Sequence, residues 1–379
     1  MIPCQRQLFD IPDDVAYINC AYLSPLMHSV AEAGRAAIAS KMRPWGVVTE
    51  DFFSGPDAMR KLTARLLNAA PADIAIIPSV SYGVAIAALN LNPKPNGEIL
   101  LLKDDFPSDV YSWRRFAAEK NLRIRTVDQP TPDAPDLTAA ILAAIGPQTR
   151  VVSVPQVHWT NGLKLDLVRI GQAARANGAA LVLDLTQSLG AMPVDIQAID
   201  PDFAVAACYK WLLGPYGIGV LYVAPRHQHG RPLEEGWIAR QGSENFAGLI
   251  NYQDEYQPGA IRFDMGERSQ FQLLPMAAAA MHQVLDWGVD NIAGSLSVLT
   301  ARIAEEASAM GLSVAPAENR APHYLGLAFA DGPPPDLLQN LRARNVHVSV
   351  RGSSVRVTPH LYNNESDIER FFDALRASL

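Results

Sequence analysis

Seven short strand-like segments, separated by helix-like stretches, constrain the fold of this chain more than any other feature. Six of them are apolar along almost their whole length, whereas residues 123–127 (RIRTV) are mixed, as in an edge strand. Strands that are apolar throughout are buried on both faces, as in a parallel sheet covered by helices. The alternation therefore predicts a doubly wound α/β domain with a mostly parallel seven-stranded sheet. The segments are residues 74–78, 99–102, 123–127, 151–154, 181–183, 203–206 and 219–223.

The regions that flank this alternating core have other residue patterns. Residues 24–70 are predicted to be helical, and the last third of the chain mixes long helices with short strands. A chain of 379 residues is long enough for two domains. We therefore expect a large domain over residues 20–285 and a small α+β domain that combines residues 1–19 with residues 286–379. The helices expected in the small domain cover 292–310, 335–344 and 365–378, and the strands 312–315, 324–328, 346–350 and 355–358.

Charge and composition exclude several kinds of partner. The net charge is −7 and no block of basic residues stands out, which argues against a nucleic-acid or anionic-membrane surface. No apolar run reaches the ~20 residues that a membrane span needs, and the first residues do not resemble a signal peptide, so we expect a cytoplasmic protein. Cys4, Cys20 and Cys208 have neither the pairing nor the spacing of a disulfide framework or zinc site, and we expect no metal.

Polar residues follow three of the predicted strands, at the sheet edge where open parallel sheets bind ligands. Ser79-Val80-Ser81 opens a helix, and its free N–H groups could cradle a phosphate, although plain N-capping by Ser81 would explain it equally. Asp184 ends an apolar strand, where a carboxylate needs a partner or serves as a cap. Lys210 lies between a buried strand and a glycine-rich turn, where it either reaches solvent or forms imines as a desolvated amine.

The order of these three features is more specific than any one of them. A phosphate turn, then an acid, then a lysine are what pyridoxal 5'-phosphate (PLP) requires. Its phosphate needs N–H donors, its pyridine nitrogen needs a carboxylate, and its aldehyde needs a lysine. The sequence therefore predicts a PLP enzyme in which Lys210 carries the cofactor as a Schiff base.

Residues 179–224 (AALVLDLTQSLGAMPVDIQAIDPDFAVAACYKWLLGPYGIGVLYVA) resemble the class V, fold-type I PLP enzymes, which include cysteine desulfurases, isopenicillin N epimerases and kynureninases. The resemblance extends from about Tyr17 to the C-terminus. It implies that Lys210 forms the internal aldimine and moves the substrate's α-proton. It also implies that Asp184 pairs with the pyridinium nitrogen and that Gln187 hydrogen-bonds the phenolic oxygen.

The same resemblance assigns the other cofactor contacts. Val80 and Ser81 would hold the phosphate, and Tyr209 occupies a position that often contacts it. Phe106, in a FPSD stretch similar to that of kynureninases, would stack on the ring, unless it is ordinary core after its strand. Trp159 and Asn161 lie where the family has a turn that lines the ring.

Two residues resemble the family's substrate-binding positions. Arg356 matches an arginine that grips the α-carboxylate, for which a planar fork is suited. Asn19 matches a loop that approaches the same carboxylate, although a turn residue is an equal alternative.

Residues 258–272 resemble a loop that reaches the partner's active site in these homodimers. Relatives have a threonine after the glycine that binds the partner's phosphate, whereas this chain has Glu267. Either Ser269 or Arg268 replaces that contact, or it is lost.

The reaction is less constrained than the cofactor. Desulfurases that pass on a persulfide have a loop cysteine shortly before the substrate arginine, and this chain has none between Asn345 and Arg356. We therefore expect an aminotransferase or a C–S or C–C lyase acting on an α-amino acid. An epimerase or racemase of the same family and a degenerate, non-catalytic PLP-fold protein are the alternatives. A nucleotide-binding oxidoreductase is disfavoured, because no G-x-G-x-x-G turn follows the first strand.

Overall fold

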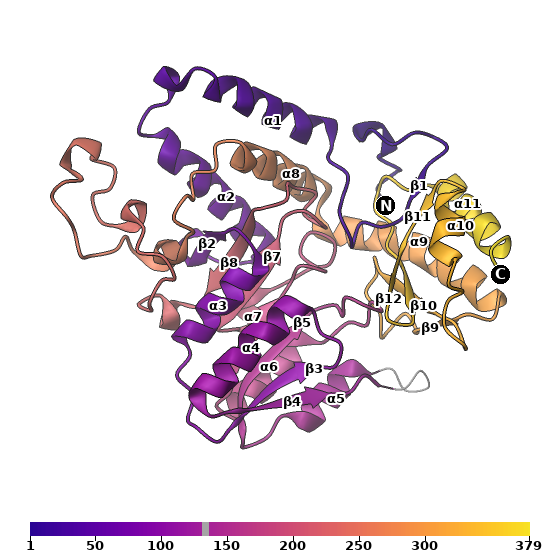
Figure 1. Ribbon diagram of the computed structural model, residues 1–379. Coiled ribbons are helices and arrows are strands. Elements are labelled where there is room, and N and C mark those ends of the chain that lie inside the picture. Colours follow the sequence, from indigo (N-terminus) through magenta and orange to yellow (C-terminus); the bar gives the residue numbers. More distant parts are fainter. Residues whose placement is uncertain (131–135) are drawn as a thin grey trace.

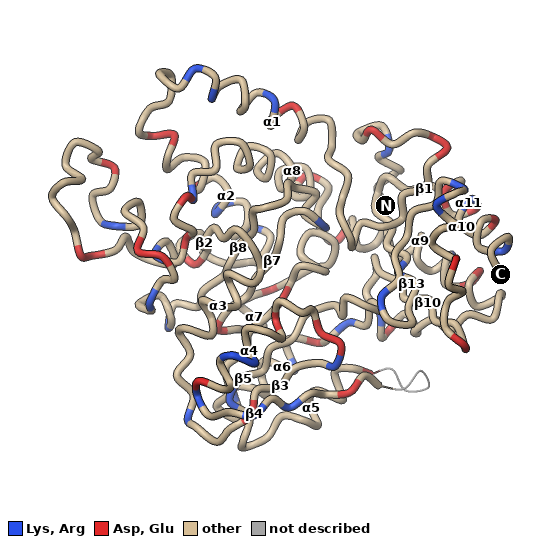
Figure 2. The backbone as a smooth tube through the Cα atoms, in the orientation of Figure 1, with Lys and Arg blue, Asp and Glu red and all other residues tan. Residues whose placement is uncertain are grey.

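A computed structural model describes residues 1–130 and 136–379 of the chain. Figure 1 shows a large lobe, in which helices cover a central sheet, and a smaller lobe that holds both termini. Acidic and basic residues are interspersed over both lobes (Figure 2). Among the described residues, no helix combines the length and the apolar character needed to cross a membrane.

The central sheet has seven strands in the order β2-β8-β7-β6-β5-β3-β4. Strand β8 runs antiparallel to both of its neighbours, and the other neighbouring pairs are parallel. The predicted α/β architecture with a mostly parallel seven-stranded sheet is therefore confirmed. The strands are β2 (Ile74–Ile77), β3 (Glu98–Leu102), β4 (Arg123–Val127), β5 (Thr149–Pro155), β6 (Ala180–Asp184), β7 (Phe203–Ala207) and β8 (Gly219–Val223).

Helices pack against both faces of this sheet, as its apolar strands require. Strand side chains alternate between faces, so Ile99 and Leu101 of β3 pack with α3 and α4, whereas Leu100 and Leu102 belong to the core on the opposite side. That second core is closed by α2, α5, α6 and α8. The large-lobe helices are α1 (His28–Lys41), α2 (Asp51–Leu67), α3 (Val80–Asn90), α4 (Pro107–Lys120), α5 (Leu137–Ala144), α6 (Leu167–Ala176), α7 (Ile196–Ile199) and α8 (Leu273–Trp287).

The smaller lobe has a core of its own. The antiparallel sheet β12-β13-β10-β9 packs against α9 and α11, and β1 (Ala16–Tyr17) joins this lobe by pairing with β11. We propose the domain division 20–285, with 1–19 and 286–379 together. The elements are α9 (Val289–Ala309), β9 (Ser313–Val314), β10 (Leu325–Ala328), α10 (Leu337–Arg342), β11 (Val346–His347), β12 (Ser349–Arg351), β13 (Ser354–Val357) and α11 (Glu365–Arg376).

Some predicted element bounds differ from the structure. The expected single strand 346–350 is two strands, because β11 pairs with β1 whereas β12 pairs with β13. The helical region 24–70 is interrupted around Pro44, where the missing N–H of proline breaks the ladder. Helix α4 begins at Pro107, since proline suits the first helical position.

Two buried histidines pack against Trp211 at the junction of the lobes. The ring of His323 meets the indole edge to face at 4.2 Å, and the ring of His360 lies 6.0 Å away. His323 Nε2 lies 2.7 Å from the carbonyl oxygen of Gln187. Burial lowers the pKa of His323 to about 4 and that of His360 to about 3, so both rings are neutral in the folded protein.

This pair predicts loss of stability in mild acid. Both folded-state pKa values lie below the unfolded value of about 6.5, so the unfolded state binds more protons and stability falls as the pH drops from 6.5 toward 4. The loss is on the order of 3 kcal/mol per ring. Urea unfolding at pH 7.5 and 4.5 should show it, and His360→Leu should reduce the difference whereas the exposed control His28→Leu should not. An unchanged difference in His360→Leu would contradict this account.

Candidate active site

A cavity of about 190 Å³ opens at the carboxyl ends of β6 and β7, beside the turn that follows β2. The structure brings all seven residues predicted to contact the cofactor to its lining. These residues are Val80, Ser81, Phe106, Asp184, Gln187, Tyr209 and Lys210.

Lys210 lies in a tight turn after β7. Backbone hydrogen bonds from Gly214 N to Cys208 O (2.8 Å) and from Cys208 N to Ile218 O (3.1 Å) close this turn, and Leu213 adopts a left-handed φ of 57° within it. The Lys210 side chain is turned inward, so the residue is only 7% exposed. Burial lowers the pKa of Lys210 to about 8, and the positive charges of Arg356 and Arg351 lower it further, whereas Asp184 opposes the shift. A neutral amine is therefore accessible near physiological pH.

Asp184 lines the cavity, and two further acidic residues lie behind it. Asp184 accepts a hydrogen bond from Thr186 N at 2.8 Å. Asp109, on the first turn of α4, lies beside it, and burial together with the neighbouring Asp184 and Asp105 carboxylates holds the pKa of Asp109 well above its usual value. Burial also raises the pKa of Asp105 to about 7. Like charges this close in a dry site disfavour ionisation of one another, so the protonated form of Asp109 is favoured beside Asp184.

Asp109 lies in the FPSD stretch, but the sequence pattern did not mark it as a residue of the site. The signal that could have identified Asp109 is its position three residues after Phe106, because one helical turn brings residues at this spacing close together.

The serine turn after β2 differs in detail from its expected form. The N-cap of α3 is Ser79, whose Oγ accepts a hydrogen bond from Tyr82 N at 3.3 Å. The alternative of plain capping by Ser81 is therefore wrong. The Ser81 hydroxyl is 3.0 Å from the Ser79 hydroxyl at the cavity wall, where the first amides of α3 offer an anion site.

Aromatic rings form the opposite wall. Phe106 ends the loop after β3, and its ring meets Trp159 edge to face at 5.5 Å. Lys210 Nζ lies 5.5 Å from the centre of the Phe106 ring and 5.6 Å from that of Tyr209. The Trp159 indole is fixed because its N–H donates to Asp104 O at 2.6 Å. Phe106 thus faces the cavity and is not ordinary core.

Gln187 and Asn161 are held by contacts within the chain. The Gln187 side chain accepts from the indole N–H of Trp211 at 3.0 Å and donates to Ala21 O at 3.2 Å. Asn161 donates to Gln129 at 2.6 Å and lines a separate hollow beyond Trp159.

A second cavity of about 390 Å³ shares the Lys210 end of the first. Arg356, on β13, is buried in its wall and donates from Nε to Ser349 Oγ (2.9 Å) and from Nη1 to Trp159 O (3.1 Å). Its Nη2 has no hydrogen-bond partner among the described residues. Asn19 does not line this cavity: its side chain accepts from Ser349 Oγ at 2.9 Å, and so supports Arg356 from behind.

These residues fit PLP on the chemistry of their donors. A buried amine, the Asp184 carboxyl, a helix N-terminus with two serine hydroxyls and a flat aromatic face surround one cavity. An unpartnered guanidinium nitrogen lies in the adjoining cavity, where a carboxylate could meet it.

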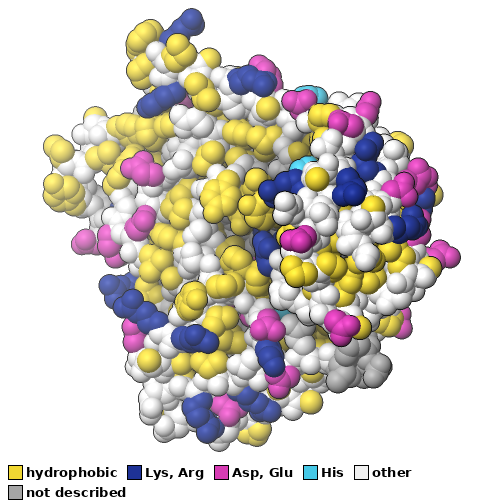
Figure 3. Space-filling model, turned by 45° about the vertical axis from the view of Figure 1, so that its right-hand side comes forward, with side chains coloured by type: hydrophobic (Ala, Val, Ile, Leu, Met, Phe, Trp, Pro, Cys, Tyr) yellow, Lys and Arg dark blue, Asp and Glu magenta, His cyan; other side chains and the backbone are white. Residues whose placement is uncertain are grey.

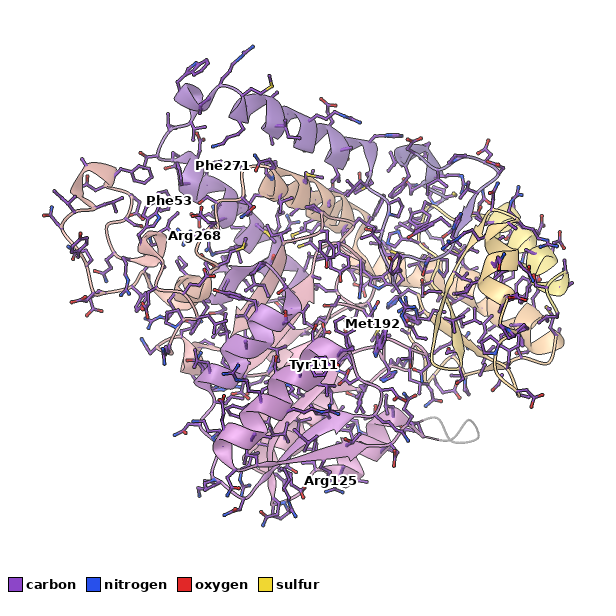
Figure 4. All side chains as sticks on the ribbon, in the orientation of Figure 1. Phe53, Tyr111, Arg125, Met192, Arg268 and Phe271 are labelled. Atoms are coloured by element: carbon purple, nitrogen blue, oxygen red, sulfur yellow. The ribbon has the colours of Figure 1, made fainter. Side chains whose placement is uncertain are left out.

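The segment predicted to reach a partner subunit is anchored in its own chain. Arg268 is buried against Phe53 (Figure 4) and donates to Asp264 at 2.8 Å, which also binds Arg60. Ser269 donates to Phe52 O at 2.6 Å. Both candidate replacements for the missing threonine are therefore engaged within the subunit, while Glu267 is exposed.

Cys20 and Cys208 are fully buried, and burial raises the pKa of both thiols, that of Cys208 to about 12. Thiols with such pKa values are poor nucleophiles at neutral pH. Both behave as small apolar residues of the core.

Comparison with known proteins identifies the family of this chain. The chain is 29% identical over 381 residues to a kynureninase of Xanthomonas oryzae pv. oryzae, covering 91% of this chain and 88% of the relative. It is 34% identical over 181 residues to the isopenicillin N epimerase of Streptomyces clavuligerus, which covers 47% of this chain and 46% of that protein.

The fold matches that of a cysteine desulfurase from Thermococcus onnurineus. The two structures superpose with a TM-score of 0.86 at 19% identity, over 100% of this chain and 99% of the other. The family model for aminotransferase class-V proteins matches residues 31–379. The chain therefore belongs to the class-V aminotransferase family of PLP-dependent enzymes.

Proposed function

We propose that this protein acts on an α-amino acid, as an aminotransferase or as a C–S or C–C lyase, with Lys210 as its covalent anchor for PLP. The observation that carries the proposal is the position of the Lys210 amine. It is buried between the aromatic wall and the acid pair, and its lowered pKa makes the neutral, nucleophilic form accessible. When bound, PLP withdraws electrons from the substrate's α-carbon.

Each residue of the site then has a task. Asp184, with Asp109 beside it, would keep a proton at the ring nitrogen. Val80 and Ser81 bind the phosphate at the start of α3, with Tyr209 beside them, and Phe106 supports the flat ring.

The remaining polar residues act on the substrate and on the ring's edge. Gln187 is the partner proposed for the phenolic oxygen. Arg356 binds the α-carboxylate through its free nitrogen, with Asn19 behind it. The Lys210 amine would serve as the base that takes the proton from the substrate's α-carbon.

Persulfide transfer does not fit the residues of this chain, although the fold matches a cysteine desulfurase. No cysteine lies in the hairpin before Arg356, and the thiols of Cys20 and Cys208 are buried and protonated. Epimerisation remains the second candidate, because an isopenicillin N epimerase is among the relatives.

We also propose a homodimer in which residues 258–272 lie near the partner's active site. Large apolar side chains are exposed on α1, on the segment before α2 and on residues 233–252, and Figure 3 shows hydrophobic atoms gathered on this side of the large lobe. Exposed apolar area of this kind marks an interface. The exposed residues are Ile38, Met42, Trp45, Val48, Leu233, Trp237, Phe246, Ile250 and Tyr252.

Lys210→Ala should abolish covalent attachment of PLP, because Lys210 carries the one amine among the described residues that line the cavity. Borohydride reduction followed by peptide mass spectrometry should find the reduced adduct on residue 210 in the unaltered protein and none in the variant. Lys120→Ala, which removes an exposed lysine, should keep the adduct. A reduced adduct at another lysine of the unaltered protein would refute the assignment.

The lowered pKa of Lys210 predicts the pH dependence of its capture. With apoprotein and PLP, reductive labelling of Lys210 at short times should rise with a midpoint near pH 8, below the 10.5 of an ordinary lysine. Since Arg356 lowers this pKa, Arg356→Gln should shift the midpoint upward. A midpoint above pH 10 in the unaltered protein would contradict the buried, cation-flanked geometry.

Arg356→Gln should weaken amino-acid binding to the holoenzyme by about 2–5 kcal/mol, the cost of removing one member of a buried charge pair. The cofactor absorbance should persist, because Arg356 does not line the first cavity. Loss of PLP from this variant would contradict the proposed role.

The reaction class can be read from products. An amino-acid panel assayed with and without a keto-acid acceptor should give turnover. Ammonia or a cleaved side chain without an acceptor identifies a lyase, and dependence on the acceptor identifies an aminotransferase. If inversion of configuration at the α-carbon is the sole change, the enzyme is an epimerase and neither a lyase nor an aminotransferase.

A further inference from the structure

One face of the β12–β13 hairpin carries two arginines toward Lys210. Ser349 pairs with Arg356 and Arg351 pairs with Ser354, so these four side chains share a face of the hairpin. The alternate residues Val350, Val355 and Val357 point the other way, into the core of the smaller lobe. The alternation fixes the direction of both guanidiniums, because a shift of one residue would bury the arginines and expose the valines.

Both arginines line the cavity next to Lys210, and both lie against one indole ring. The guanidinium carbon of Arg351 is 5.8 Å from the centre of Trp159, and that of Arg356 is 5.9 Å from it. Neither arginine has a carboxylate within ion-pair distance among residues 1–130 and 136–379. Burial, together with the nearby positive charge of Arg356, lowers the pKa of Arg351.

The two guanidiniums differ in how firmly they are held. Arg356 is buried and is fixed by Ser349 and by Trp159 O. A fixed position suits the α-carboxylate, which is the same group in every α-amino acid. Arg351 is half-buried, and its one hydrogen bond runs from Nη1 to the carbonyl of Val350 at 2.7 Å. Arg351 lies at the end of β12, next to the Gly352 turn, and it also lines the separate hollow beyond Trp159. Within the part of the chain that the structure describes, its remaining N–H donors have no partner, so they can follow a group of variable position.

We propose that Arg351 binds a second acidic group of the substrate, so that the enzyme takes an α-amino acid with a carboxylate on its side chain. This inference rests on the proposed function, because it assigns the α-carboxylate to Arg356. Two uncompensated cations in one partly dry cavity cost free energy that two carboxylates of a single ligand would offset. The cavity between them is also lined by Tyr22, Leu23 and Tyr216, which accommodate an aliphatic spacer.

Spectral titration of the holoenzyme with matched pairs of amino acids tests the proposal. L-Glutamate is compared with L-glutamine, and L-2-aminoadipate with L-norleucine, so that each pair differs chiefly in the distal carboxylate. In the unaltered enzyme we expect the acidic member of at least one pair to bind about tenfold more tightly or better, the value of a charge-assisted hydrogen bond. Arg351→Gln should bring that ratio close to one, and Arg351→Lys should restore part of it.

The control is Arg344→Gln, which removes the same charge from an exposed position outside both cavities and should keep the ratio. Equal binding of the acidic and neutral members by the unaltered enzyme would overturn the proposal, even if Arg351→Gln failed to fold. An unchanged ratio in Arg351→Gln, with both affinities lowered together, would also overturn it, since Arg351 would then share the α-carboxylate. If the holoenzyme binds amino acids but does not prefer the acidic member of either pair, the proposed function stands and only this inference fails. If no amino acid changes the spectrum, the proposed function fails first.

Discussion

The desolvation of the Lys210 amine is the constraint on which the rest of the site depends. A lysine is seldom buried without compensation, because the charged ammonium loses its hydration. Here the turn after β7 places the amine inside the protein. The carboxyls of Asp184 and Asp109 lie on one side of it, and the guanidinium groups of Arg356 and Arg351 lie on the other side, at the mouth of the site. The amine lies between them with a pKa of about 8. This arrangement of charge suits a cofactor with a basic ring nitrogen at one end and an anionic substrate at the other.

The smaller lobe supplies the mouth of the site and is tied to the large lobe by short polar contacts. Arg356 donates to the carbonyl of Trp159, and the hydroxyl of Tyr324 donates to that same carbonyl. His323 contacts the Gln187 carbonyl, in the segment that follows Asp184. Each contact joins a residue of the smaller lobe to a segment that follows a strand of the large sheet, so the position of Arg356 depends on how the lobes pack.

Much of the large lobe could be predicted because its signals are local. Short, fully apolar runs such as 203–206 that alternate with helical stretches favour strands buried on both faces, and the residues that follow parallel strands gather at one edge of the sheet. This is why Ser81, Asp184 and Lys210 were found from their place after strands and do meet in one cavity, whereas Phe106 was predicted from the family resemblance. Two-residue strands such as β9 and β11 could not be bounded, because they exist only through pairing with distant partners.

By itself, the sequence determined the α/β class, the edge of the sheet that binds a ligand and the set of residues at the cofactor cavity. Tertiary structure decided which polar groups remain free there. It used Ser79 instead of Ser81 as the helix cap, engaged Arg268 and Ser269 within the chain, and placed Asn19 behind Arg356. It also brought Asp109 to Asp184 and Arg351 to the mouth, neither of which the sequence had marked. The physical reason is that periodicity and turn residues act over a few neighbours, whereas hydrogen-bond partners and charge compensation come from segments up to several hundred residues apart.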